Sequence, residues 1–199
     1  SAVLMDEPLT VIDPDLKFRL RRQLKEINHK YSSTLIYVTH DQNEAMTFAE
    51  NIIVMDEGNI VQVGTPAELF ERPKTTFVGY FIGAPAMNFI DCEAYENKTV
   101  RLGDVPISTD TDISSVKSKK LKLGIRAEYI KIADKMGNNR IPVSIQRVED
   151  LGSHKLVTAV FNGINLKVKA ERDKLILSDD VYLELPPENC CLYADDTLI

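Results

Sequence analysis

The feature that most limits the fold of this chain is an order of segments that occurs twice near its start: an apolar run, a polar tip, then a helical pattern. Residues 2–5 read AVLM and residues 35–38 read LIYV, so each run is apolar at every position. Continuous apolar runs of this length are typical of strands buried on both faces of a parallel sheet. Runs that alternate with helical patterns indicate βαβ units. The first part of the chain is therefore expected to be α/β, with both strands buried.

Helix start signals agree with this order. Asp13 and Pro14 supply an N-cap and a proline at the first helical position. Apolar residues then recur at helical spacing, which predicts one helix with a single buried stripe. The stripe consists of Leu16, Leu20, Leu24, Ile27 and Tyr31.

Two capping-box patterns and one turn signal continue the α/β part to about Pro85. Asp41 is followed three residues later by Glu44, and Thr65 by Glu68, so a helix is expected to start at each pair. Between them, residues 52–55 and 60–63 flank the turn sequence DEGN, which predicts a hairpin.

From about Asn88 the sequence changes to short alternating strands separated by turn residues. Residues 157–161 and 164–170 flank Asn162-Gly163, a pair that favours the positive φ angles of a type I′ hairpin. Further strand candidates lie at residues 120–125, 140–148 and 181–185. We therefore expect two domains, an α/β unit over residues 1–87 and an all-β barrel or sandwich over residues 88–199.

Charge and cysteine content exclude some classes of function. The chain has 24 Lys and Arg against 30 Asp and Glu, a net charge of -6, so its field repels nucleic acid and anionic lipid. The cysteine count is odd and two of the three cysteines are adjacent, which indicates no disulfide framework and a reducing setting. No apolar run reaches the roughly 20 residues that cross a bilayer.

The strongest candidate for chemistry follows the first apolar run, where Asp6 and Glu7 come directly after the strand. Open α/β sheets bind ligands at the carboxyl ends of their strands. In a nucleotide hydrolase Asp6 would hold Mg²⁺ through its water shell, because a hard cation prefers oxygen ligands. Glu7 would polarise the attacking water. The alternative is a polar strand end without a catalytic role.

His40 follows the second apolar run at the same predicted sheet edge. Its imidazole could hydrogen-bond a γ-phosphate or orient a water, or it could serve only a local hydrogen bond. A metal site formed with Glu44, four residues away, lacks further ligands.

Taken together, these stretches resemble the ABC ATPases. Residues 3–9 (VLMDEPL) are similar to the Walker B strand with its catalytic Glu, residues 10–13 (TVID) to the D-loop, and residues 37–42 (YVTHDQ) with residues 44–46 (EAM) to the switch histidine region. Residues 64–66, 81–85, 87–89, 124–128 and 148–152 resemble the maltose and glycerol-3-phosphate importer branch. The resemblance implies part of an ABC nucleotide-binding domain followed by an OB-like regulatory domain, also called TOBE.

The resemblance also implies roles for single residues. Asp6 would lie in the magnesium shell, Glu7 would be the general base and His40 the γ-phosphate switch. Asp13 would make a contact across the ATP-sandwich dimer, although it is equally explained as a helix cap. The implied partners are a second ATPase subunit, membrane-spanning permease subunits and a regulatory protein at the OB-like domain. The implied location is the cytoplasmic face of the cell membrane.

The sequence contains no G-x-x-x-x-G-K-[ST] stretch, no LSGGQ-like signature and no glutamine loop upstream of residue 3. The backbone nest and lysine that hold the phosphates of ATP are therefore not encoded in these 199 residues. We interpret the chain as the C-terminal part of a subunit that binds ATP and Mg²⁺ as a whole. On its own it is expected to be inactive.

Two other functions remain open at this stage. The β-rich part could act alone as an OB-type binder of a small ligand or oligonucleotide, or it could pair subunits and receive regulatory partners. Grooves for single-stranded nucleic acid combine basic charge with stacking aromatic residues. With 7% aromatic residues, no Trp and a negative net charge, this chain fits that class poorly.

Overall fold

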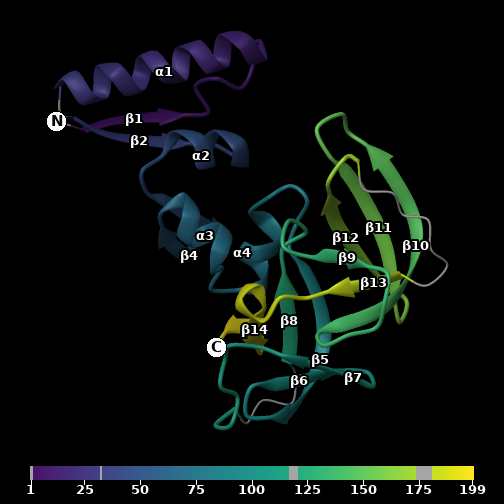
Figure 1. Cartoon of the computed structure of the whole chain (residues 1–199). Coiled ribbons are helices and arrows are strands. Elements are labelled where there is room, and N and C mark those ends of the chain that lie inside the picture. Colours follow the sequence, from purple (N-terminus) through teal and green to yellow (C-terminus); the bar gives the residue numbers. More distant parts are fainter. Residues whose placement is uncertain (1, 32, 117–120, 174–180) are drawn as a thin grey trace.

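The computed structural model describes residues 2–31, 33–116, 121–173 and 181–199 (Figure 1). Its first part is α/β, with the elements β1 (Ala2–Asp6), α1 (Pro14–Tyr31), β2 (Thr34–Val38), α2 (Gln42–Phe48), β3 (Ile52–Asp56), β4 (Asn59–Gly64), α3 (Pro66–Glu71) and α4 (Thr76–Phe81). The described remainder is β-structure with one 3-10 turn: β5 (Asn88–Glu96), β6 (Thr99–Leu102), β7 (Val105–Ser108), β8 (Leu121–Ile125), β9 (Lys131–Ala133), β10 (Arg140–Asp150), β11 (Lys155–Phe161), β12 (Ile164–Ala170), β13 (Val181–Glu184), η1 (Pro187–Asn189), β14 (Cys191–Ala194) and β15 (Thr197–Leu198). The predicted fold class, α/β followed by all-β, is confirmed.

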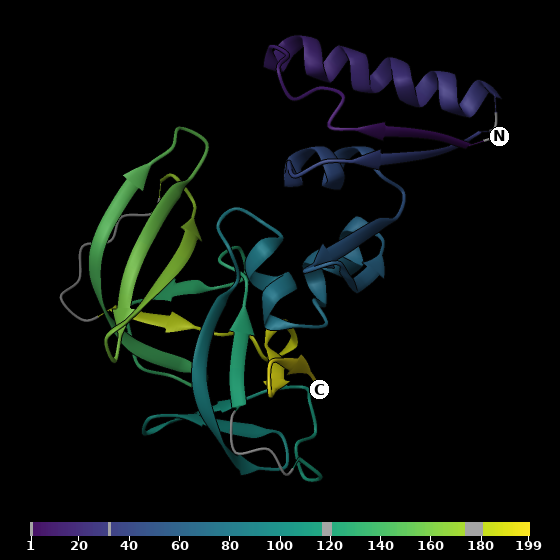
Figure 2. The ribbon, with the colours of Figure 1, turned by 180° about the vertical axis from the view of Figure 1, so that it is seen from behind.

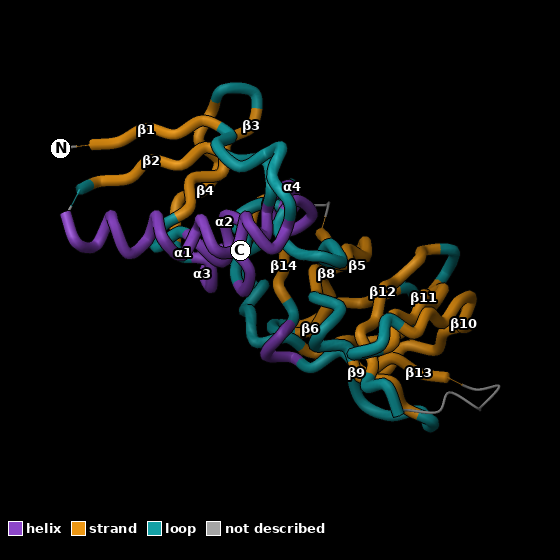
Figure 3. The backbone as a smooth tube through the Cα atoms, turned by 90° about the horizontal axis from the view of Figure 1, so that it is seen from above, coloured by secondary structure: helices purple, strands orange, loops and turns teal. Residues whose placement is uncertain are grey.

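Strands β1 and β2 form the predicted βαβ unit. They pair in parallel, from Ala2 opposite Thr34 to Asp6 opposite Val38. Helix α1 is the crossover and runs alongside both strands (Figures 1 and 3). It starts as expected, since the Oδ1 atom of Asp13 accepts a hydrogen bond from the backbone N–H of Asp15 at 3.0 Å.

The apolar runs of these elements are not fully buried among the described residues. Leu4 is 69% exposed and Ile36 is 51% exposed. In the expected stripe of α1, only Leu20 and Leu24 are half-buried, and the other three residues are exposed. Within the described residues, β1 and β2 make a sheet of only two strands with α1 beside it. Apolar faces that were expected to be covered therefore meet solvent.

A small core follows β2. Strands β3 and β4 form the predicted hairpin, with Glu57 and Gly58 at φ 46° and 80° in the turn. Helix α3 has the predicted capping box, because Thr65 and Glu68 each bond the other's backbone N–H. The apolar sides of α3, α4 and the hairpin enclose the buried residues Ile52, Val54, Leu69, Val78 and Ile82.

The β-rich part folds around one large core. A six-stranded sheet in the order β15-β14-β8-β5-β6-β7 faces a five-stranded sheet in the order β12-β11-β10-β13-β9. One cluster of buried residues takes side chains from both sheets, as in a barrel or sandwich. Asn162 and Gly163 have φ of 46° and 81°, which confirms the type I′ hairpin. The predicted strand at 120–125 is β8, although Lys120 lies outside the described residues.

Residues 193–198 return to the linker between α3 and α4. The Tyr193 hydroxyl donates to the carbonyl of Pro73 at 3.0 Å. The Thr76 N–H donates to the carbonyl of Asp196 at 3.0 Å, and that of Leu198 to the carbonyl of Lys74 at 2.9 Å. These bonds join the last strands of the barrel to the α/β part. Among the described residues, no helix combines the length and the apolar character that a membrane crossing needs.

Candidate functional site

The parallel pairing of β1 and β2 brings their polar ends to one edge of the sheet. Asp6 is the last residue of β1 and lies opposite Val38, the last residue of β2. The N–H of Glu7 continues the ladder by donating to the carbonyl of Val38 at 2.9 Å. Both strands are seen from behind in Figure 2, side by side along their length. The residues that follow them, Glu7 and Thr39, therefore start from neighbouring points.

Glu7 and His40 are in direct contact at this edge. His40 Nδ1 lies 2.5 Å from Oε1 of Glu7, and the backbone N–H of His40 donates to the same oxygen at 3.0 Å. The Thr10 hydroxyl donates to Oε2 of Glu7 at 2.8 Å. Glu7 has a φ of 46°, outside the β region, so the extended backbone of β1 ends at Asp6. A carboxylate and an imidazole that are 33 residues apart in sequence thus form one pair.

The pair shifts the pKa of each partner. The hydrogen bond from His40, followed by that from Thr10, holds the pKa of Glu7 below its ordinary value of 4.5. The same hydrogen bond to Glu7, followed by the attraction of its charge, raises the pKa of His40 above 6.5. Between pH 4.5 and 6.5 the pair therefore consists of a carboxylate and an imidazolium. The imidazole side chain is 74% exposed, so its second nitrogen, Nε2, is accessible to a ligand.

Asp6 and Asp13 lie apart from this pair in their contacts. Asp6 is exposed at the end of β1 and makes no side-chain hydrogen bond or ion pair within the described residues. Asp13 accepts from the N–H groups of Asp15 and Lys17, at the start of α1. The structure thus shows Asp13 as a helix cap.

Glu44, for which the sequence predicted a place in a capping box, is buried. Its Oε2 accepts hydrogen bonds from the hydroxyls of Tyr37 and Thr39 at 3.0 and 3.1 Å, and its Oε1 lies 3.4 Å from Nζ of Lys17. It is only 4% exposed. One carboxylate therefore joins α1, β2, α2 and the residue before His40. Desolvation, followed by the hydrogen bond to Glu44, raises the pKa of the Tyr37 hydroxyl.

The capping box expected at Asp41 is half formed. The Oδ1 atom of Asp41 accepts from the N–H groups of Asn43 and Glu44, as predicted. The reciprocal bond from the Glu44 side chain is replaced, because the Asp41 N–H donates to the hydroxyl of Thr39 at 3.0 Å. The sequence showed the spacing of Glu44 but not the long-range partners that engage it instead.

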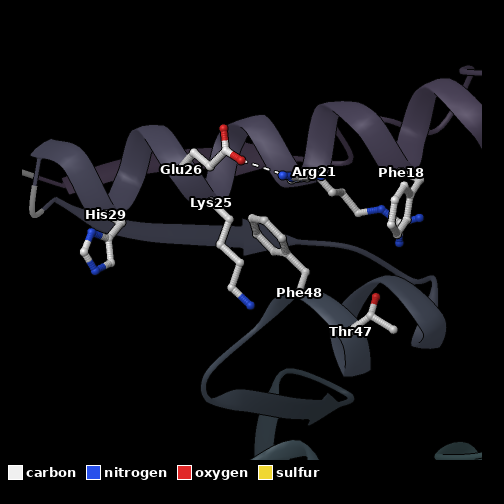
Figure 4. Close-up of a pocket in the computed structure, with 8 residues that line it drawn as sticks. Phe18, Arg21, Lys25, Glu26, His29, Thr47 and Phe48 are labelled. Carbon is white, nitrogen blue, oxygen red and sulfur yellow. Dashed lines mark hydrogen bonds and ion pairs between the residues drawn. The ribbon is translucent and has the colours of Figure 1, made fainter.

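A separate groove lies between α1 and α2 (Figure 4). Its volume is about 590 Å³. Phe18 and Phe48 contribute rings, and the ion-paired side chains of Arg22 and Glu26 also line the groove. The groove is lined by Phe18, Arg21, Arg22, Lys25, Glu26, His29, Thr47 and Phe48, so it contains none of the predicted site residues. No group of three or more His, Cys, Asp or Glu suited to a metal occurs in the described part of the chain.

In comparisons with known proteins, this chain matches an OB-domain family model and import ATP-binding proteins. Residues 83–130 match the model of the MalK OB fold domain. The sn-glycerol-3-phosphate import ATP-binding protein UgpC of Psychromonas ingrahamii is 36% identical over 98% of this chain and 53% of its own length. That of Yersinia pestis is 33% identical over 99% of this chain and 56% of its own length. The chain spans about half the length of the curated relatives it matches.

Solved structures also match this chain, one of them a molybdate-binding protein. The molybdate-bound form of the cytoplasmic molybdate-binding protein ModG aligns with 54% of this chain and 95% of its own chain, at a TM-score of 0.43 and 10% identity.

Proposed function

Because the chain belongs with the ATP-binding subunits of sugar-type ABC importers, and corresponds to the C-terminal part of such a subunit, we propose that it supplies the general base and the γ-phosphate switch of an ATP hydrolase that powers import of carbohydrate or polyol phosphate. The observation that carries this proposal is the contact of Glu7 with His40 at the end of two parallel strands. We assign residues 1–87 to the nucleotide-binding domain and residues 88–199 to the OB-like regulatory domain.

Glu7 is suited to receive a proton from water. Its Oε1 bonds both the backbone N–H and the Nδ1 atom of His40, and its Oε2 accepts one hydrogen bond from the Thr10 hydroxyl. Since a carboxylate offers about four lone-pair sites, Oε2 keeps a site that can accept a hydrogen bond from an attacking water. The pKa of Glu7 lies below its ordinary value of 4.5, so the side chain is a carboxylate at neutral pH and can accept that hydrogen bond.

His40 is suited to hold a phosphate oxygen. Its Nδ1 faces Glu7, while the exposed ring can donate from Nε2. The raised pKa of His40 favours the form in which both ring nitrogens carry protons. A single imidazole thus joins the base to the phosphate that the water attacks. The position of the imidazole would therefore differ between the states with and without the γ-phosphate.

Asp6 fits a magnesium site as one member of a larger donor set. Mg²⁺ is usually held by one or two carboxylates together with waters and substrate phosphates. Asp6 offers one exposed carboxylate at the sheet edge, next to Glu7. When bound, Mg²⁺ neutralises charge on the phosphate oxygens. Asp13 is assigned a contact across the dimer of ATPase subunits, in addition to capping α1.

The partners follow from the same proposal. A second ATPase subunit, permease subunits in the membrane and a regulatory protein at the barrel would contact this subunit at the cytoplasmic face of the membrane. Since these 199 residues contain no phosphate-binding loop motif, hydrolysis requires a subunit that joins them to such a loop. The isolated chain is expected to bind Mg-ATP weakly and to release no phosphate. Nanomolar affinity in calorimetry would contradict this.

Replacement of the base tests the proposal. In a subunit that carries both this chain and a phosphate-binding loop, Glu7→Gln should leave ATP binding intact and slow turnover by about 10² to 10⁴, the usual worth of a positioned base. Glu50→Gln is the matched control, because Glu50 is exposed after α2 and makes none of these contacts. Unchanged turnover in Glu7→Gln would remove Glu7 from the catalytic role.

A further inference from the structure

A hydrogen bond connects the His40 loop, residues 39–42, to the segment that leads into the first barrel strand. Gln42 is the first residue of α2 and lies two residues after His40. Its side-chain Oε1 accepts from the backbone N–H of Gly83 at 3.1 Å. Gly83 follows α4, five residues before the first barrel strand at Asn88. The two residues are 41 positions apart, so this bond is set by tertiary structure and not by local geometry.

On its other side, Gly83 packs against an arginine of the barrel. Arg126 directly follows β8 and is 1% exposed. Its Nε donates to the carbonyl of Phe70 at 3.0 Å, and its Nη1 donates to the carbonyls of Gly79, at 2.9 Å, and Ile82. The guanidinium also lies over the Phe70 ring, 4.4 Å from its centroid. Arg126 thus holds α3 and α4 to the end of a barrel strand.

The peptide unit between Ile82 and Gly83 is bonded on both sides, because its carbonyl accepts from Nη1 of Arg126 and its N–H donates to Oε1 of Gln42. A Cβ atom at Gly83 would lie 2.9 Å from Nη1 of Arg126 and 3.2 Å from the Phe70 ring. Gly83 also has a φ of 102°, which L-residues rarely adopt. A shift of the guanidinium is therefore transferred to the Gly83 N–H, and from there to the Gln42 side chain.

The opposite end of the His40 loop is fixed independently of the barrel. Thr39 is bonded to the buried carboxylate of Glu44, and the N–H of Asp41 is bonded to the Thr39 hydroxyl. Glu44 takes its other partners from α1 and β2. Of the loop residues 39–42, Gln42 is therefore the one whose side chain reaches toward the barrel.

We propose that Gln42 is a positioning residue. It fixes the loop that carries His40 relative to the segment before the first barrel strand, through Gly83 and Arg126. The inference deepens the proposed function, on which it rests, because it names the route by which the barrel acts on the γ-phosphate switch. A change at Arg126 alters the placement of His40, and a ligand drawn to His40 alters the junction by the same linkage. The regulatory domain then acts on the hydrolytic edge through one side-chain amide.

Nuclear magnetic resonance of the ¹⁵N-labelled 199-residue chain tests the first link. Gln42→Met keeps the side-chain volume but removes the acceptor, so exchange of the Gly83 amide proton should become roughly fivefold faster, the factor that one ordinary hydrogen bond represents. Gln42→Glu keeps an acceptor oxygen and should restore slow exchange. Asn43→Ala, at an exposed neighbouring position of α2, is the matched control and should leave the amide unchanged. Equal exchange in all four chains would overturn the link.

The second link is read at His40. Gly83→Ala places a methyl group against Arg126 and should change the ring ¹⁵N signals and the titration midpoint of His40, whose charged neighbours are Glu7, Asp41 and Glu44. Phe70→Leu, which removes the ring beneath Arg126 and keeps Gly83, should change the same signals in a folded chain. Retained barrel amide signals show that each variant is folded. A His40 titration identical to that of the unchanged chain in both variants would overturn the coupling.

These outcomes separate the coupling from the proposed function. The titration of His40 is measured without ATP hydrolysis, so its response to Gly83→Ala and Phe70→Leu supports or overturns the coupling alone. Turnover of Glu7→Gln in a subunit with a phosphate-binding loop tests the function alone.

Discussion

At the scale of single residues, the orientation of one imidazole decides what the site can do. His40 gives Nδ1 to Glu7 and leaves Nε2 to solvent. The pair stabilises the fold in a defined pH window. The His40 contribution is fully present below pH 6.5 and is lost as pH rises through its raised folded-state pKa. The Glu7 contribution is fully present above pH 4.5 and is lost as pH falls through its lowered pKa. Both contributions are thus complete between pH 4.5 and 6.5.

Removing the carboxylate charge of Glu7 should lower the pKa of His40. In Glu7→Gln, the titration midpoint of the His40 ring is expected to fall toward 6.5, because the first-named cause of its raised pKa is the hydrogen bond to Glu7. Ring ¹⁵N titration of the 199-residue chain measures this. Thr10→Val is the control, since it removes a hydrogen bond to Glu7 on the oxygen away from His40 and should leave a smaller change. A midpoint that stays raised in Glu7→Gln would show that the contact does not form in solution.

Removing the imidazole should impair hydrolysis. In a subunit that carries a phosphate-binding loop, His40→Ala is expected to lower turnover by about 10² to 10³, the usual effect of losing one charge-stabilising donor. His29→Ala, on exposed α1, is the matched control. Steady-state rates near those of the unchanged subunit would favour the local hydrogen-bonding role of His40.

At the scale of elements, the turns are determined by residues that are close in sequence. Gly163 lies in the β11–β12 turn with a φ of 81°, and a Cβ built there meets no atom within 4 Å. Any cost of a side chain at this position is therefore conformational and not steric.

Gly163→Ala should destabilise the barrel by about 1 to 2 kcal/mol, the cost of forcing an L-residue into the left-handed region. Asn162→Gly, at the neighbouring turn position, is the control and should have little effect, since glycine adopts positive φ readily. Urea unfolding followed by circular dichroism measures both. An unchanged midpoint in Gly163→Ala would mean that the turn relaxes to another type.

What could be predicted from sequence follows the same distinction. The caps at Asp13, Asp41 and Thr65 and the two hairpins depend on local chemistry, and all were predicted. Burial of residues 2–5 and 35–38 depends on packing layers that local sequence does not contain, and these residues are exposed or half-buried here. Glu44 shows the limit within the site. Its spacing from Asp41 predicted a capping box, but Tyr37, Thr39 and Lys17 engage its carboxylate from other elements.

At the scale of the whole molecule, the barrel and the β1–β2 unit differ in how much buried core stabilises them. The barrel has a continuous buried core that both of its sheets share. The β1–β2 unit has Leu9 and Glu44 as its buried neighbours, and strand pairs β1–β2 and β3–β4 form separate sheets. Few buried apolar contacts correspond to low local stability.

Hydrogen exchange should reveal this difference. In the monomeric 199-residue chain at low concentration, amides of residues 35–38 are expected to exchange much faster than those of residues 157–168, because β2 has one strand partner and exposed side chains, whereas β11 has two strand partners. Residues 52–64, in the β3–β4 hairpin, provide an internal comparison. Equally strong protection of residues 35–38 and 157–168 would show that the unit is stable without further packing.

The bonds from residues 193–198 to residues 73–76 also set an order of events during synthesis. A ribosome releases the chain from its N-terminal side, so the α3–α4 linker emerges more than a hundred residues before the strands that bind it. Until Tyr193 and Asp196 have been translated, the Pro73 carbonyl and the Thr76 amide lack these partners. These bonds are therefore made late, after the β-hairpins of the barrel have had time to form, whereas the bonds of Arg126 to α3 and α4 can form earlier.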